Sequence, residues 1–460
     1  MGEGRYWLQT LGCPKNQVDS DKLEGRLASQ GYQRADDPSG ADLVVVNTCA
    51  FIESARQESI DTVLELADLR RAGARLVVTG CMAERYGDEL SDALPEIDLV
   101  AGFGIDLIDE PPLPLGVPVS LAAKPGPRPS KGFDLLELAR PASEVPWAYV
   151  KVAEGCDRIC GFCAIPSFRG KQRSRRVDEV MAEVELLLAG GATPSGDPAP
   201  AVREIVLVAQ DLASYGRDRS RPGERVKAGR SPIAALTRAI SARVERTRLL
   251  YLYPSGLTDE LIDAVLGTGV PYFDLSLQHV SRPLLARMRR WGDGDRFLQR
   301  IADIRAADAH ATFRSSFILG YPGETEQDHD RLLAFLDEAQ LDWAGFFPFS
   351  NEAGTHAADL PDQVPAKLAL ERLREVSELQ DAITAARRDL LIGQTRQVLV
   401  DEPGCGRTVH EAPEIDGVVH LPSDTTAGEL LDVVITHAVG PDLHAERVAD
   451  QAPLVVGAHR

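Results

Sequence analysis

The sequence has no apolar run that approaches the roughly 20 residues a helix needs to cross a bilayer. Its first residues, Met1 to Tyr6, also lack the apolar core of a signal peptide. We therefore expect a cytoplasmic protein with no membrane partner. Cysteine is scarce, with seven among 460 residues. In a reducing compartment such cysteines act as metal ligands or remain free thiols, and they do not form disulfides.

Basic residues are also in deficit, since 50 Lys and Arg face 70 Asp and Glu and leave a formal net charge of −20. Proteins that bind the phosphates of nucleic acids usually present a positive surface. The acidity therefore favours a basic partner, although it serves solubility equally well. A chain of 460 residues is too long for one ordinary core, so we expect two or three domains.

The first expected domain, residues 1–110, alternates strand-like and helical patterns. The strand-like runs are Tyr6–Gly12, Asp42–Cys49 and Arg75–Cys81, with helical patterns at 16–30 and 55–71. Such alternation predicts an α/β domain with a parallel sheet. A proline-rich stretch then follows, and we assign residues 111–140 to a linker because its prolines cannot form a regular element.

Residues 141–380 repeat a strand–helix unit six times. The predicted strands are Trp147–Val152, Arg203–Ala209, Arg248–Tyr253, Tyr272–Leu277, Ala311–Leu319 and Trp343–Phe349. Six units are fewer than the eight of a closed barrel, so we expect a partial (β/α)6 barrel with an open side.

The last expected domain, residues 381–455, has short strand-like runs between turn signals and predicts a small all-β barrel. Its charge is strongly negative. From Leu391 onward four Arg face eleven Asp or Glu, a net of −7.

Three cysteines, Cys156, Cys160 and Cys163, form a CxxxCxxC pattern directly after the first barrel strand. A structural zinc site takes four protein ligands, and a ferredoxin cluster normally takes four cysteines. Three thiolates on a four-iron cluster would leave one iron open for a substrate or cofactor. The alternatives are a zinc knuckle or chance clustering.

Three further cysteines, Cys13, Cys49 and Cys81, are distant in sequence, but each lies at or just after the end of a predicted strand. In an open parallel sheet, ligands bind outside the carboxyl ends of the strands. We therefore expect a second site with three thiolates. Three separate buried cysteines are the alternative. Cys405 has no partner in this pattern.

Polar residues also follow the other barrel strands, among them Gln210 and Gln278. One rim of the barrel is therefore expected to carry the site. The basic segment Arg169–Arg176 would balance cluster charge, meet the substrate, or simply be solvated. His279 is either a proton donor or acceptor at the rim or a structural histidine.

The CxxxCxxC loop resembles that of radical S-adenosylmethionine (SAM) enzymes, and the chain as a whole, from Arg5 to Val448, resembles the methylthiotransferases. The closest resemblance is to the RimO group. It is carried by the segments Leu11–Ser20, Ile165–Gly170, Gln210–Asp211 with Tyr215–Gly216, Phe317–Thr325 and Ala412–Gly417. Two positions depart from the family pattern, Leu212 in place of Thr and Ser276 in place of Pro.

This resemblance implies an N-terminal cluster domain, a radical SAM barrel and a C-terminal TRAM domain, an OB-like barrel. It implies two 4Fe-4S clusters and SAM as cofactors, and a methylthio group added to an aspartate β-carbon of protein twelve of the small ribosomal subunit. An electron donor such as flavodoxin or ferredoxin would act as a second partner. The residues implied for the SAM pocket are Phe162, Gln210, Gln278 and Arg314, although Phe162 equally suits simple packing. No catalytic side chain is assigned, because the clusters and SAM carry the chemistry.

Two alternatives remain at this stage. A tRNA methylthiotransferase would share both cysteine sets, but we expect such an enzyme to have a basic terminal domain, and this one is acidic. A non-catalytic iron–sulfur carrier would need no SAM pocket and no open iron.

Overall fold

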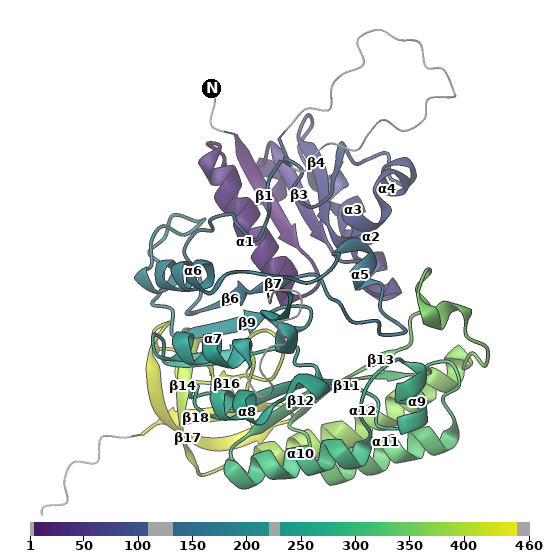
Figure 1. The fold of residues 1–460 in the computed structure, drawn as a ribbon. Coiled ribbons are helices and arrows are strands. Elements are labelled where there is room, and N and C mark those ends of the chain that lie inside the picture. The colour runs from purple at the N-terminus through teal and green to yellow at the C-terminus, as the bar shows by residue number, and fades with distance from the viewer. Residues whose placement is uncertain (1–3, 109–131, 220–230, 449–460) are drawn as a thin grey trace, which may run out of the picture.

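The structure is a computed structural model, and it describes residues 4–108, 132–219 and 231–448. Figure 1 shows an N-terminal α/β domain above a central barrel of strands and helices, with a small β-barrel packed against one end of the central barrel. Within the described residues, no helix is long and apolar enough to span a membrane.

The N-terminal domain is a five-stranded sheet in the order β2-β1-β3-β4-β5, with every pair parallel. The central strand β3 is buried along its whole length, as its run of apolar residues predicts. The strands are β1 (Arg5–Thr10), β2 (Gln33–Arg34), β3 (Leu43–Thr48), β4 (Arg75–Gly80) and β5 (Leu99–Ala101); the helices are α1 (Pro14–Ser29), α2 (Glu53–Leu69), α3 (Cys81–Tyr86) and α4 (Asp88–Ala93). The prediction of a parallel α/β domain is confirmed.

Six parallel strands form the central barrel in chain order. Two three-stranded sheets, β6-β9-β10 and β11-β12-β13, are joined by a parallel bridge between Leu252 and Leu275. The strands are β6 (Trp147–Lys151), β9 (Glu204–Val208), β10 (Arg246–Leu249), β11 (Tyr272–Gln278), β12 (Thr312–Leu319) and β13 (Trp343–Pro348). Among the pairings of the described residues none joins β13 to β6, so the partial barrel is confirmed with its open side.

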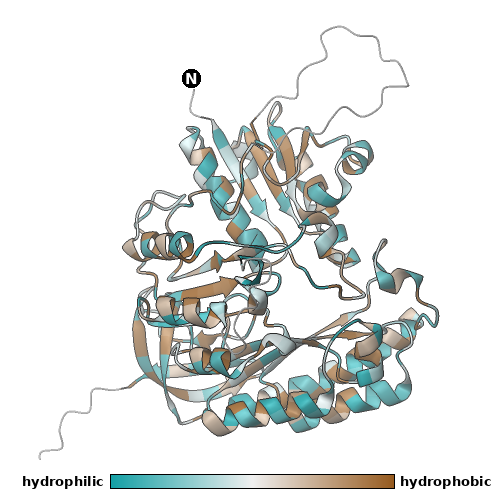
Figure 2. Cartoon of the chain, viewed as in Figure 1, coloured by the Kyte–Doolittle hydropathy of each residue, from teal (hydrophilic) through white to brown (hydrophobic). Residues whose placement is uncertain are grey.

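Helices cover the outside of this barrel, and Figure 2 shows apolar strands inside with polar outer helix faces. They are α5 (Ile165–Phe168), α6 (Val177–Ala189), α7 (Pro232–Ser241), α8 (Asp259–Leu266), α9 (Arg282–Arg287), α10 (Gly294–Ala307), α11 (Glu326–Ala339) and α12 (Ala366–Asp389); a small pair, β7 (Ala153–Glu154) and β8 (Arg173–Ser174), flanks the cysteine loop. The short helix α9 was absent from our expectations, because six residues give too few turns for a periodic pattern.

The terminal domain is a closed barrel in the order β14-β15-β16-β18-β17. Its strands are β14 (Thr395–Glu402), β15 (Cys405–Arg407), β16 (Val419–His420), β17 (Leu430–Val439) and β18 (Asp442–Arg447). The small all-β barrel is confirmed. The strands β15 and β18 were missed, one because it is very short and the other because four of its six residues are charged or polar.

A segment of the terminal domain, Arg407–Asp416, closes the amino end of the central barrel. Thr312 and Trp343 both hydrogen-bond to His410, and the Tyr272 hydroxyl donates to Asp416 at 2.6 Å. The first residue of every barrel strand has its side chain against this segment: Trp147, Glu204, Arg246, Tyr272, Thr312 and Trp343. The carboxyl ends of the strands therefore remain free to form a site.

The domain limits stay predictions. Residues 111–131 of the expected linker and 449–455 of the terminal domain lie outside the described residues. The remaining linker residues pack on the N-terminal domain, where Lys22 donates to the carbonyls of Leu136 and Leu138. Helix α12 runs across the expected limit at residue 380.

Candidate active site

A cavity of about 390 Å³ lies between the N-terminal sheet and the carboxyl ends of the barrel strands. All six cysteines of the two expected triads line it: Cys13, Cys49, Cys81, Cys156, Cys160 and Cys163. The four residues expected to bind SAM line the same cavity: Phe162, Gln210, Gln278 and Arg314. Ten residues chosen from strand ends and motifs thus share one space.

The N-terminal triad is positioned by strand ends. Cys13 is the N-cap residue of α1, Cys49 follows β3, and Cys81 opens α3 directly after β4. Gly12 has φ of +94°, and a Cβ there would lie 2.8 Å from the Cys49 Cβ and 3.0 Å from its Sγ. Only glycine therefore fits beside these thiols.

The barrel triad lies in the loop after β7. The backbone N–H of Arg158 donates to the Cys156 Sγ at 3.4 Å, and the Arg290 guanidinium donates to the Cys160 Sγ at 3.2 Å. Gly155, with φ of +76°, starts the loop, and a Cβ there would lie 2.2 Å from the Lys171 carbonyl oxygen. Donors aimed at sulfur stabilise thiolates and tune bound clusters.

The pKa values of the cysteine thiols favour binding of a positively charged metal group. Burial raises the pKa of Cys156 to about 11, and it raises the pKa of Cys49 and of Cys163 to about 12. Burial opposes ionisation of Cys13 as well, but Lys15 and Arg169 lower its pKa below the ordinary value. Most of these thiols thus stay protonated at neutral pH unless a metal supplies positive charge.

The donor set fits an iron–sulfur cluster. No group of three His, Cys, Asp or Glu side chains in the described parts of the chain is arranged to hold a single metal ion. A four-iron cluster requires another arrangement, because each cysteine binds a different iron. The six thiols that line the cavity are donors of the type that such a cluster takes.

A buried ionic network joins the N-terminal triad to the barrel strand that leads into the second cysteine loop. Arg169 donates to the Cys81 Sγ at 3.0 Å and to both Glu154 carboxylate oxygens at 2.9 and 3.0 Å. Lys151, fully buried, is paired with Asp19 of α1 and with Glu154 at 2.6 Å. Arg169 therefore belongs to the interface between the N-terminal domain and the barrel, and the interpretation that it balances charge is the one that the contacts favour.

The rest of that basic segment is mixed. The Arg173 and Arg176 side chains are 57% and 58% exposed, whereas Arg175 is buried and paired with Glu183 at 2.6 Å. His279 is fully buried and does not line the cavity. Its Nδ1 accepts from the Ser281 N–H at 3.0 Å, and burial lowers its pKa to about 4. It is a structural histidine.

The expected SAM-binding side chains are held by neighbours. Gln210 donates to Glu154 at 2.8 Å, and Arg314 donates to Asp274 at 3.2 Å. Gln278 has φ of +70°, a strained conformation for a non-glycine residue that turns the chain at the end of β11.

Several cavity residues were not found from the sequence. Arg158 and Arg290 lie over the Tyr253 ring, with guanidinium carbons 3.8 and 4.2 Å from its centroid. Lys15 lies over the Tyr251 ring at 3.3 Å. The arginines that surround Arg290 in the sequence could have indicated a functional role for it. Nothing in the sequence links Lys15 to Tyr251.

Comparison with known proteins agrees with this architecture. Three family models match: Uncharacterized protein family UPF0004 over residues 5–102, the Radical SAM superfamily over 150–336 and the TRAM domain over 392–448. A protein named "Ribosomal protein uS12 methylthiotransferase RimO" from Moorella thermoacetica is 41% identical over 94% of this chain and 96% of its own length. The chain belongs to the RimO family. The RimO protein of Kineococcus radiotolerans is 39% identical over 95% of this chain and 96% of its own length.

As a RimO-family member the chain is a radical SAM methylthiotransferase, and the radical SAM family implies one 4Fe-4S cluster and SAM. Among solved structures, the radical SAM methyltransferase TsrM of Kitasatospora setae aligns with a TM-score of 0.47 at 14% identity, over 75% of this chain and 72% of that one. Coproporphyrinogen III oxidase of Escherichia coli aligns over 52% of this chain and 53% of its own, at 14% identity and a TM-score of 0.39.

Proposed function

We propose that this enzyme adds a methylthio group to the β-carbon of an aspartate in ribosomal protein uS12. The observation that carries the proposal is the shared cavity, in which two cysteine triads face the residues expected to bind SAM. Relatives named as uS12 methylthiotransferases, aligned over nearly their whole length, support the substrate. An unactivated carbon–hydrogen bond is too weak an acid for a side-chain base near neutral pH, so radical chemistry suits the reaction.

Each triad has its own role in this proposal. Cys156, Cys160 and Cys163 would hold the cluster that binds SAM, while Cys13, Cys49 and Cys81 would hold a second cluster. These groups supply the radical, the sulfur and the methyl group when bound. The chain itself supplies the thiolates and places positive charge beside Cys81 and Cys160.

The SAM pocket would be formed by Phe162, Gln210, Gln278 and Arg314. Gln210 is tied through Glu154 to the network that also holds Arg169. Arg314 is held from below by Asp274 and, at 3.5 Å from its Nε, by Asp416 of the terminal domain. The Arg314 side chain lines the cavity, and its guanidinium group could bind a carboxylate of the ligand there.

The acidic terminal domain favours a ribosomal protein over tRNA as substrate. Three of its eleven carboxylates, Asp401, Glu411 and Asp416, are paired with arginines of the interface. Other carboxylates of this domain are exposed and would attract a basic protein. They include Glu402, Asp424, Asp432 and Glu446. An acidic electron carrier, a flavodoxin or a ferredoxin, would supply the electron.

The test is a choice of substrates under anaerobic conditions. Reconstituted enzyme with SAM and dithionite is offered uS12 and bulk tRNA in parallel, and mass spectrometry locates any methylthio group. We expect modification of the uS12 aspartate, and none in a Cys13→Ala variant that still forms 5′-deoxyadenosine. Modified tRNA with unmodified uS12 would contradict the proposal. A lack of 5′-deoxyadenosine with every substrate would favour an iron–sulfur carrier.

A further inference from the structure

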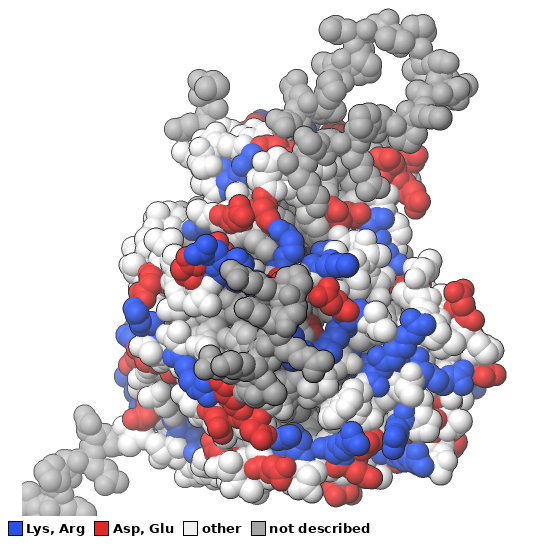
Figure 3. Space-filling view, in the orientation of Figure 1, with Lys and Arg blue, Asp and Glu red and all other residues white. Residues whose placement is uncertain are grey.

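A basic segment borders the barrel triad. Residues Arg282–Gly292 contain four arginines and no Asp or Glu, in a chain whose net charge is −20. Arg282 and Arg289 are exposed, and Trp291 is 45% exposed. Figure 3 shows a group of Lys and Arg side chains on the side of the molecule where α9 lies in Figure 1. Arg287 is paired with Asp362 at 3.5 Å, so the exposed positive charge of this segment is that of Arg282 and Arg289.

The same segment touches the cysteine loop directly. The Gly161 N–H donates to the Met288 carbonyl at 2.8 Å, and Arg290 donates to the Cys160 Sγ at 3.2 Å. A Cβ on Gly161 would lie 3.3 Å from the Arg287 carbonyl oxygen, so the two segments are in close contact. Trp291 is the next residue after Arg290. The exposed segment is thus separated from a cluster thiolate by one side chain.

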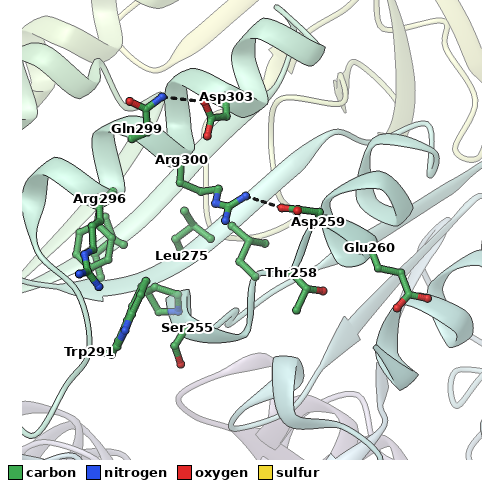
Figure 4. Close-up of a pocket in the computed structure, with 14 residues that line it drawn as sticks. Ser255, Thr258, Asp259, Glu260, Leu275, Trp291, Arg296, Gln299, Arg300 and Asp303 are labelled. Atoms are coloured by element: carbon green, nitrogen blue, oxygen red, sulfur yellow. Dashed lines mark hydrogen bonds and ion pairs between the residues drawn. The ribbon is translucent and has the colours of Figure 1, made fainter. Parts of the chain in front are cut away.

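A neighbouring groove of about 650 Å³ does not share this charge. Figure 4 shows Trp291 and Arg296 at one end of it and the Arg300–Asp259 pair, at 2.7 Å, further along. Two arginines in its lining are opposed by three carboxylates: Asp259, Glu260 and Asp303. The groove therefore offers little attraction to an anionic partner, and the positive charge comes from the basic segment Arg282–Gly292.

We propose that the exposed side of Arg282–Trp291 is the docking surface for an acidic one-electron carrier protein. The inference rests on the proposed function, which requires an electron at the barrel cluster. The reduced carrier loses one electron and the cluster gains one, with no atom transferred. Complementary charge orients and speeds the encounter. Arginine and an exposed tryptophan are the residues enriched in protein interfaces.

Binding of flavodoxin and of a [2Fe–2S] ferredoxin to the reconstituted enzyme tests the surface. We expect Arg282→Glu combined with Arg289→Glu to weaken the better-binding carrier at least about tenfold at low salt, with less effect at high salt. Trp291→Ala should weaken binding at both salt concentrations. The matched control is Arg243→Glu, whose arginine is 55% exposed beyond the C-terminal end of α7.

Formation of 5′-deoxyadenosine separates docking from chemistry. With dithionite as reductant, the charge-reversed enzyme should match the wild type, whereas carrier-driven formation should fall with the loss of binding. The inference is wrong if neither carrier binds the wild type, or if the double variant binds as well as Arg243→Glu does. Wild-type enzyme that forms no 5′-deoxyadenosine with dithionite would instead contradict the proposed function.

Discussion

Glu204 is the first residue of β9 and lies between the central barrel and the terminal domain. Of the carboxylates in this interface, we expect its removal to be the most destabilising. It is fully buried, accepts from the Arg248 Nε at 2.6 Å and accepts from Arg407 at 3.0 Å. Arg246 lies beside the pair and donates to the Arg407 carbonyl oxygen at 3.0 Å. In Glu204→Gln, buried guanidinium groups lose their shared negative charge.

Two estimates of the cost agree. Breaking a buried ion pair by removing one partner costs about 3–5 kcal/mol. Burial alone would raise the pKa of Glu204, but Arg248 and Arg407 lower it to about 2. A pKa moved from 4.5 to about 2 corresponds to about 3 kcal/mol of stability, present above pH 4.5 and lost as the pH falls toward 2.

Urea unfolding of the apoprotein at pH 7, followed by tryptophan fluorescence, measures this cost. Trp147 and Trp343 lie in the interface and report on it. The control is Glu185→Gln, which breaks an exposed pair with Arg243 and should cost less than about 1 kcal/mol. Adding Arg248→Met to Glu204→Gln should recover part of the loss. A loss in Glu204→Gln no larger than in the control would refute the reasoning.

Three further outcomes are expected. Burial lowers the pKa of His410 to about 4, so the free energy of unfolding should fall as the pH drops from 6.5 to 4. The fall should be up to about 3 kcal/mol larger in the wild type than in His410→Gln, and parallel pH curves in urea titrations would count against this. Asp416→Asn should weaken SAM binding about tenfold in calorimetry, because Arg314 loses one of its two carboxylates; an unchanged Kd would remove Asp416 from this role. Arg169→Met should lower the iron bound after reconstitution by up to half, because Cys81 loses its donor, while Arg169→Lys retains more; equal iron in all three proteins would be the contrary result.

Local patterns predicted most of the architecture. The parallel N-terminal sheet, the six barrel strands and the small terminal barrel follow from alternation, run length and turn residues, which act over neighbouring residues. Short elements such as α9 and β15 carry too few residues for a period to appear. The cysteine loop could be recognised because three ligands lie within eight residues.

The sequence by itself determined the ligand types, the six strands of the central barrel and the strand ends at which functional residues lie. Only the tertiary structure decided that Cys13 and Cys163 share one cavity, that Arg169 is buried against Cys81 while Arg173 is exposed, and that Arg407–Asp416 closes the barrel. The physical reason is range. Strand and helix periodicity is a property of adjacent residues, whereas burial and charge pairing depend on segments distant in the sequence, such as Cys81 and Arg169, 88 residues apart, or Glu204 and Arg407, 203 residues apart.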